Sequence, residues 1–130
     1  MIVSAIIVAA GSGSRFGEQK QFKQLQGFAL YYHSLRQFLN CKEIHEIILV
    51  VPQDRINKTK NEITNIKTAK KIIVTGGGEK RQESVKNGIL STSNITELVC
   101  IHDGARPFVS EELIKNSIEP CSNNDGAIIA

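Results

Sequence analysis

The sequence lacks the features that would place it among zinc-binding, secreted or membrane proteins. Its three cysteines, Cys41, Cys100 and Cys121, are odd in number, lie far apart and form no C-x-x-C pair, which argues against zinc and favours a reducing compartment. The apolar run over residues 2–10 is too short to span a membrane and has no basic leader or cleavage site. We therefore expect a cytoplasmic protein without a membrane partner.

The chain also has no dominant basic run, internal repeat, low-complexity tract or linker composition. Its formal charge of +3 comes from 16 basic and 13 acidic residues interspersed along the sequence. So mild an excess suits a phosphate-bearing small ligand as well as nucleic acid, and charge alone does not decide between them. With 130 residues, 41% of them hydrophobic, we expect residues 1–130 to form a single globular domain with one core.

What the sequence does contain is an alternation of strand and helix patterns. Strands are predicted over residues 2–9, 44–51, 71–74, 98–101 and 126–130. Helices are predicted over residues 30–39, 53–67 and 82–90, and after an N-cap at Ser110. This order predicts an α/β fold, a Rossmann-like and mostly parallel sheet with helices on both faces. Ligands should then bind at the carboxyl ends of the strands, near the point where the strand order reverses.

Two of the predicted helices carry specific expectations about which side chains face the core. In the helix over residues 82–90, the apolar side chains Val85, Ile89 and Leu90 are expected on the inward side. In the helix that follows Ser110, Leu113 and Ile114 are expected to point inward.

The loop after the first strand reads A-A-G-S-G-S-R-F-G-E-Q-K-Q-F, residues 9–22. Gly11 and Gly13 allow positive φ and a close backbone approach, so successive N–H groups can surround phosphate oxygens. Arg15 and Lys20 add two cations, which suits a triphosphate. The loop is neither a Walker sequence nor G-x-G-x-x-G. The alternative is a tight turn with exposed basic residues.

The loop over residues 75–85 reads T-G-G-G-E-K-R-Q-E-S-V. Three consecutive glycines leave a space without side chains that a flat base could enter. Glu79, Arg81 and Ser84 offer hydrogen-bonding groups to the edge of such a base. The alternative is a flexible turn with no ligand.

The loop over residues 102–108 reads H-D-G-A-R-P-F. Asp103 follows a buried strand, where one carboxylate can hold Mg²⁺ together with phosphate oxygens and water. Asp103 is therefore the candidate metal ligand, and the alternative is a structural pair with Arg106. His102 is expected to be a packed or hydrogen-bonded core histidine.

In this order and spacing, the three loops closely resemble those of the 2-C-methyl-D-erythritol 4-phosphate cytidylyltransferase family. The matching segments are A-A-G-S-G-S-R-F-G with K-Q-F, G-G-E-K-R-Q-E-S-V and H-D-G-A-R-P-F. The resemblance runs over the whole chain and implies the fold of the nucleotide-diphospho-sugar transferases. In one departure, Gln19 stands where the family usually has proline before the lysine. The family also continues beyond the point where this sequence stops, so we expect a truncated, N-terminal nucleotide-binding part.

The resemblance implies a role for residues of all three loops. The pair that stabilises the transition state at the α-phosphate would be Arg15 and Lys20. The substrate-binding residues would be Ala9, Ala10, Gly11 and Gly13 at the triphosphate, Gly78, Glu79, Arg81 and Ser84 at the cytosine, and Arg106 toward the second substrate. Mg²⁺ would be bound by Asp103.

The implied reaction joins CTP and 2-C-methyl-D-erythritol 4-phosphate to give a CDP-alcohol and pyrophosphate, a step of non-mevalonate isoprenoid biosynthesis. A homodimer is expected for the full-length protein, with no nucleic-acid partner, and the 130-residue chain alone is expected to be inactive. Two alternatives stay open. One is a ribitol 5-phosphate cytidylyltransferase, which shares the fold and the loops, and the other is a non-catalytic nucleotide-binding module.

Overall fold

In the computed structural model, the described residues are 1–10, 24–25, 28–104 and 109–122. Their main sheet has four parallel strands in the order β5-β4-β1-β6. These strands are β1 (Val3–Val8), β4 (Glu46–Val51), β5 (Lys71–Gly76) and β6 (Leu98–Asp103). The chain passes from β1 outward through β4 to β5 and then returns to the opposite side of β1. The strand order therefore reverses between β1 and β6, where ligands bind in open α/β sheets.

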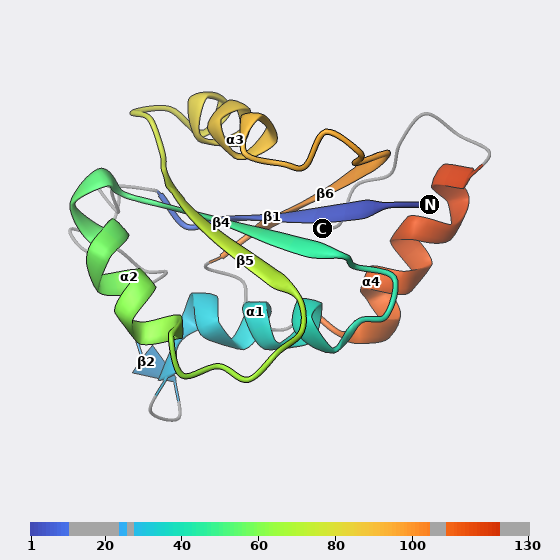
Figure 1. The fold of residues 1–130 in the computed structure, drawn as a ribbon, viewed down its shortest axis with the longest axis horizontal. Helices are drawn as coiled ribbons and strands as arrows, with labels where there is room; N and C mark the ends of the chain where they lie inside the picture. The colour runs from blue at the N-terminus through green and yellow to red at the C-terminus, as the bar shows by residue number, and fades with distance from the viewer. Residues whose placement is uncertain (11–23, 26–27, 105–108, 123–130) are drawn as a thin grey trace.

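Helices cover both faces of this sheet, as the sequence predicts. They are α1 (Leu30–Asn40), α2 (Ile56–Ile63), α3 (Arg81–Leu90) and α4 (Glu111–Ile118), with short 3-10 turns η2 (Gln53–Arg55) and η3 (Glu119–Ser122). A two-residue ribbon, β2 (Gln24–Leu25) and β3 (Phe28–Ala29), precedes α1. Figure 1 shows α3 on one side of the sheet and α1, α2 and α4 on the other. No helix of the described residues is long and apolar enough to cross a membrane.

The core is divided by the sheet into two clusters. Successive strand residues point to opposite faces, so neighbours on β1 such as Ile6 and Ile7 belong to different clusters. The larger cluster contains Ile7 together with Leu35 and Phe38 of α1 and Ile114 of α4. The smaller cluster lies on the α3 side, and its buried members are Ile6, Val8, Ile48 and Val50.

Helix α3 packs against the smaller cluster through a residue with no side chain. A Cβ atom added to Gly88 would lie 2.7 Å from Ile6 Cγ2 and 3.1 Å from Val50 Cγ2. Glycine at this position therefore lets the backbone of α3 approach the sheet more closely than any other residue would allow.

The inward face of α3 differs from the predicted one. Val85 packs against the smaller cluster, but Ile89 and Leu90 are 45% and 73% exposed. The buried residues are instead Ser84 and Gly88, one helical turn apart. The prediction is therefore confirmed for Val85 and wrong for Ile89 and Leu90, because the helix turns small residues toward the sheet at Ser84 and Gly88.

Most predicted boundaries agree with the structure to within two residues. The exception is the helix predicted over residues 53–67, which starts as η2 and ends at Ile63. The strands β5 and β6 run two residues further than predicted. Ser110 caps α4 as predicted, its side chain accepting a hydrogen bond from the backbone N–H of Leu113 at 3.0 Å. Ile114 is buried, but Leu113 is 41% exposed, so that half of the prediction was wrong. The strand predicted over residues 126–130 lies outside the described residues.

The carboxyl-terminal end of α1 is held by a cation from a distant part of the chain. The ammonium group of Lys70 donates hydrogen bonds to the backbone oxygens of Phe38, at 3.3 Å, and Cys41. A positive charge at this end interacts favourably with the negative end of the helix dipole. Because the lysine is partly buried, its pKa is lowered.

Candidate nucleotide-binding site

The first and third predicted loops begin side by side at the carboxyl edge of the sheet. Val8, the last residue of β1, is in register with Asp103, the last residue of β6. The N–H of Gly104 donates to the backbone oxygen of Val8 at 2.8 Å, which continues the pairing one residue further. A Cβ atom on Gly104 would lie 3.0 Å from Ala9 Cβ, so the two loops start in contact.

The first and second loops also meet at this edge. The N–H of Ala9 donates to the oxygen of Val50 at 2.7 Å, and that of Gly77 donates to Val51 at 2.8 Å. A Cβ atom on Gly77 would lie only 2.3 Å from Ala10 Cβ. The two adjacent alanines therefore contact both other loops, and all three strand ends converge on them.

The glycine loop, residues 76–78, is braced by the start of α3. Ser84 is 2% exposed, and its Oγ accepts a hydrogen bond from the N–H of Gly78 at 3.2 Å. The side chain of Glu83 lies so close to Gly78 that an added Cβ would come within 2.4 Å of its carboxylate oxygen. Glu79 and Arg81 are exposed beside this loop. The structure thus places the four residues predicted around a base in one short segment.

Two further side chains, which the sequence analysis missed, bind the same loop. Asn87 Nδ2 donates to the oxygen of Gly76 at 3.0 Å, and Gln53 Nε2 donates to the oxygen of Gly77 at 3.3 Å. Asn87 follows Ser84 by three residues, a spacing that places both on the same side of a helix. That spacing could have indicated Asn87. Nothing in the sequence indicates Gln53, because its contact depends on the pairing of β4 with β5.

Asp103 lies partly buried at the end of β6, next to the first loop. The described residues contain no group of three or more His, Cys, Asp or Glu side chains that could hold a metal ion. Mg²⁺ does not need such a group, because it is commonly bound by one or two carboxylates plus phosphate oxygens and water. A single carboxylate at this position therefore fits Mg²⁺ that is held jointly with a phosphorylated substrate.

His102 has a structural position, as the sequence predicts. Its side chain is 2% exposed and forms a 3.1 Å hydrogen bond with Ser34 Oγ of α1. Its ring packs against Phe38 with the centroids 5.5 Å apart. Since strand residues alternate, this places His102 in the larger cluster and Asp103 on the opposite side of β6.

The remaining residues of the predicted site lie outside the described residues. These are Gly11, Gly13, Arg15 and Lys20 of the first loop and Arg106 of the third. Their proposed roles stay predictions.

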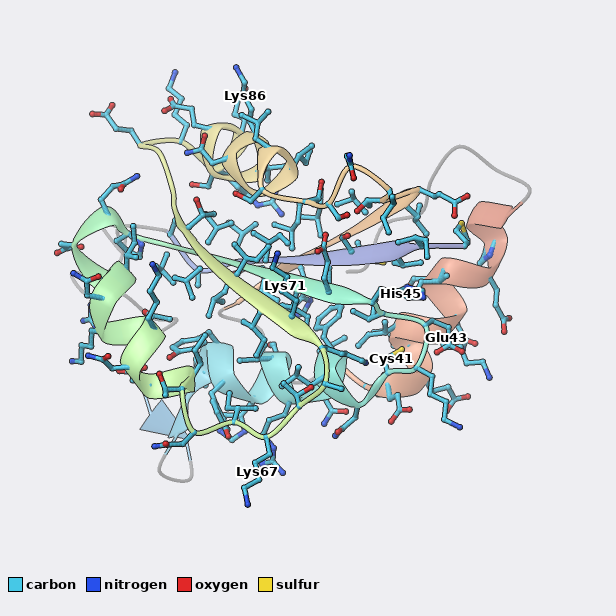
Figure 2. The ribbon with its side chains drawn as sticks, in the orientation of Figure 1. Cys41, Glu43, His45, Lys67, Lys71 and Lys86 are labelled. Atoms are coloured by element: carbon cyan, nitrogen blue, oxygen red, sulfur yellow. The ribbon has the colours of Figure 1, made fainter. Side chains whose placement is uncertain are left out.

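The cysteine side chains that the structure describes are not candidates for nucleophiles. Cys41 and Cys100 are buried, and neither is part of a disulfide bond. Burial raises the pKa of Cys41, whose Sγ donates to Glu43 Oε2 at 3.2 Å, and a raised pKa disfavours the reactive thiolate. Figure 2 shows Cys41 and Glu43 next to each other beside α4, away from the glycine loop.

Comparison with known proteins identifies one family. The model of the 2-C-methyl-D-erythritol 4-phosphate cytidylyltransferase family matches residues 3–130. The chain is 42% identical over 120 residues to the protein of that name from Clostridium botulinum Eklund 17B, with 91% of this chain and 53% of that protein covered. It is 40% identical over 131 residues to the protein of that name from Alkaliphilus metalliredigens. That match covers 98% of this chain and 54% of the Alkaliphilus protein.

A solved structure gives the same result for the fold. The crystal structure of 4-diphosphocytidyl-2C-methyl-D-erythritol synthase from Anaerococcus prevotii superposes with a TM-score of 0.82 at 33% identity. The match covers 95% of this chain and 52% of that one. The chain therefore spans about half the length of the relatives it matches.

Proposed function

Because the chain belongs to the 2-C-methyl-D-erythritol 4-phosphate cytidylyltransferase family, we propose that it forms the nucleotide-binding part of an enzyme that transfers CMP from CTP to 2-C-methyl-D-erythritol 4-phosphate. The products are a CDP-alcohol and pyrophosphate, in non-mevalonate isoprenoid biosynthesis. The observation that carries this proposal is the convergence of three loops on Ala9 and Ala10, at the edge where the strand order reverses.

The three loops have complementary parts in this proposal. The backbone that follows Ala9 and Ala10 receives the triphosphate, together with Gly11 and Gly13. The glycine loop receives the cytosine, with Gly78, Glu79 and Ser84 at its edge and Arg81 supporting the pocket. Arg106 lies toward the second substrate. The short distance between Ala10 and the glycine loop supports a single nucleotide that spans both loops.

The chemistry follows from the substrates. A phosphate oxygen of the acceptor forms a bond to the α-phosphorus of CTP while the bond between that phosphorus and the bridging oxygen breaks, which releases pyrophosphate. The attacking oxygen is already anionic near neutral pH, so no general base is needed. Positioning and charge stabilisation by Arg15 and Lys20 then supply the catalysis.

We include Mg²⁺ in the proposal, with Asp103 as its protein ligand. When bound, the ion neutralises charge on the phosphates of the nucleotide. Asp103 supports this role because its carboxylate lies at the end of β6, beside the start of the triphosphate loop.

The whole protein is proposed to be a homodimer in the cytoplasm that binds CTP and a sugar-alcohol phosphate and no nucleic acid. Cys41 and Cys100 are not part of disulfide bonds, which is compatible with a reducing compartment. The dimer rests on the family resemblance alone.

The test is a turnover assay with the intact protein. CTP and Mg²⁺ are supplied with either 2-C-methyl-D-erythritol 4-phosphate or ribitol 5-phosphate, and pyrophosphate release is measured. We expect a much larger kcat/KM with the first alcohol. A preference for ribitol 5-phosphate would mean that this alcohol, and not the proposed one, is the acceptor. The absence of turnover with both alcohols would support a non-catalytic binding module.

A further inference from the structure

The outer side of the glycine loop has no neighbouring strand among the described residues. β5 is an edge strand of the sheet, so its carboxyl end has β4 on one side only. On the other side lies an open cavity of about 470 Å³, whose lining includes Gln53, Thr75, Gly76, Asn87 and Leu90. The conformation of the loop therefore cannot be fixed by strand pairing on both sides.

Two peptide groups of this loop are instead each held at both ends. In the peptide between Gly76 and Gly77, the oxygen accepts from Asn87 and the N–H donates to Val51. In the peptide between Gly77 and Gly78, the oxygen accepts from Gln53 and the N–H donates to Ser84 Oγ. Because a peptide group is planar, a bond at each end fixes the orientation of the whole plane.

The two amide side chains come from different elements and have equivalent tasks. Gln53 belongs to η2, directly after β4, while Asn87 lies in the middle of α3. Each donates to a backbone carbonyl of the glycine loop, Asn87 to that of Gly76 and Gln53 to that of Gly77. Glycine has no Cβ to restrict its backbone dihedral angles. The two side-chain hydrogen bonds therefore restrain a backbone that the glycine residues themselves leave flexible.

We propose that Asn87 and Gln53 are positioning residues that hold the glycine loop in the orientation needed to distinguish cytosine from uracil. The inference rests on the proposed function, in which this loop receives the base. Cytosine and uracil differ in whether their edge offers a donor or an acceptor at the 4-position. Discrimination between them therefore requires partner groups in fixed directions, because a pocket rejects a mismatched base by leaving polar groups unpaired.

The test uses the intact enzyme with two variants that remove the donors without adding charge, Asn87→Leu and Gln53→Met. We expect each to raise KM for CTP by about fivefold, the effect of losing one modest hydrogen bond, with kcat within about twofold. The ratio of kcat/KM for CTP to that for UTP should fall by a similar factor, and KM for the alcohol phosphate should not change. Asn57→Leu, at an exposed position on α2, is the matched control.

Thermal unfolding of each variant separates this role from a purely structural one. Gln53 is exposed, so Gln53→Met should fold normally even if Asn87→Leu does not. A lower melting temperature with an unchanged KM for CTP and an unchanged CTP-to-UTP ratio would overturn the inference. If the unmodified enzyme does not turn over CTP at all, the proposed function fails instead.

Discussion

Small side chains at the end of β1 determine how closely the three loops approach one another. Ala9 lies against Gly104 and Ala10 against Gly77, with no space for a Cβ atom on either glycine unless its neighbour moves. The N–H groups of Ala9, Gly77 and Gly104 are used in backbone hydrogen bonds, so the strand ends are held together at these contacts. The small side chains of Ala9 and Ala10 are therefore explained by the close contacts at the strand ends.

Replacement of Gly88 by alanine should destabilise the protein despite alanine's better helix propensity. Alanine gains about 1 kcal/mol over glycine within a helix. The added Cβ would lie 2.7 Å from Ile6 Cγ2 in a buried contact, and overpacking of a core costs about 1–3 kcal/mol. We therefore expect a net loss of up to about 2 kcal/mol, measured by urea unfolding.

Lys86→Ala is the control on the same helix. Figure 2 shows Lys86 on α3 pointing away from the sheet, so this change should alter the free energy of unfolding by less than about 0.5 kcal/mol. Equal or greater stability of Gly88→Ala would mean that α3 can move away from the sheet at no cost.

Removal of the Arg15 guanidinium should affect the chemical step of the proposed reaction. A charged group aimed at the developing negative charge on the α-phosphate contributes about 3 kcal/mol, equivalent to about a hundredfold in rate. Arg15→Ala in the intact enzyme should therefore lower kcat by about that factor, as measured by pyrophosphate release at saturating CTP. Turnover close to that of the unmodified enzyme would refute the role assigned to Arg15.

Among the secondary-structure elements, α1 and α2 are connected by a partly buried hydrogen bond. The hydroxyl of Tyr31 on α1 donates to Glu62 on α2. Burial, and then the bond to Glu62, raise the pKa of this hydroxyl above its ordinary value of 10.0. The folded protein therefore keeps a proton that the unfolded chain loses above about pH 10.

This linkage predicts a loss of stability at alkaline pH. The contribution of Tyr31 to the free energy of unfolding should be complete below about pH 10 and decrease as the pH rises further, because the unfolded state then binds fewer protons. Tyr31→Phe should be less stable by about 1–2 kcal/mol at pH 8. The difference from the unmodified protein should become smaller toward pH 11. Urea unfolding of both proteins across this range is the measurement, and a constant difference would contradict the linkage.

The elements could be predicted from the sequence wherever hydrophobic pattern and packing agree. In the helix predicted over residues 30–39, the residues at helical spacing, Leu30, Tyr31, Ser34, Leu35 and Phe38, are buried, and Ser110 caps α4. The prediction failed for Ile89 and Leu90 because hydrophobicity suggested an inward position while the close approach at Gly88 set the rotation of the helix. A single sequence does not contain the distance between a helix and a sheet.

The candidate site was predictable to a similar degree. The loops could be located because glycines and isolated charges follow buried strands, and Ala9, Ala10, Ser84 and Asp103 lie at the edge expected for them. The hydrogen bonds from Gln53 and Asn87 could not be predicted, because they depend on which strand lies at the edge of the sheet and on which side of the loop is open.

For the whole molecule, the two faces of the sheet are packed unequally. The larger cluster has residues of three helices packed against the strands, whereas the smaller one is covered by α3, and Val99 and Ile101 of β6 are only partly buried there. The proposed nucleotide site lies at the carboxyl end of this sheet, where the loops that follow β1, β5 and β6 meet, so its base-binding and phosphate-binding loops are both attached to strands of the sheet. Nucleotide binding should therefore depend mainly on residues within this chain.

Turnover, in contrast, should depend on more than these 130 residues. The chain spans about half the length of its relatives, and we expect the site of the second substrate to need the rest of that length. We expect the isolated chain to bind CTP with Mg²⁺ weakly in calorimetry and to release no pyrophosphate when the acceptor is added. UTP titrated in parallel is the control, and it should bind more weakly still if the glycine loop recognises the base. Product formation by this chain alone would show that the acceptor site is already complete within it. Equal binding heats for CTP and UTP would show that the glycine loop does not recognise the base.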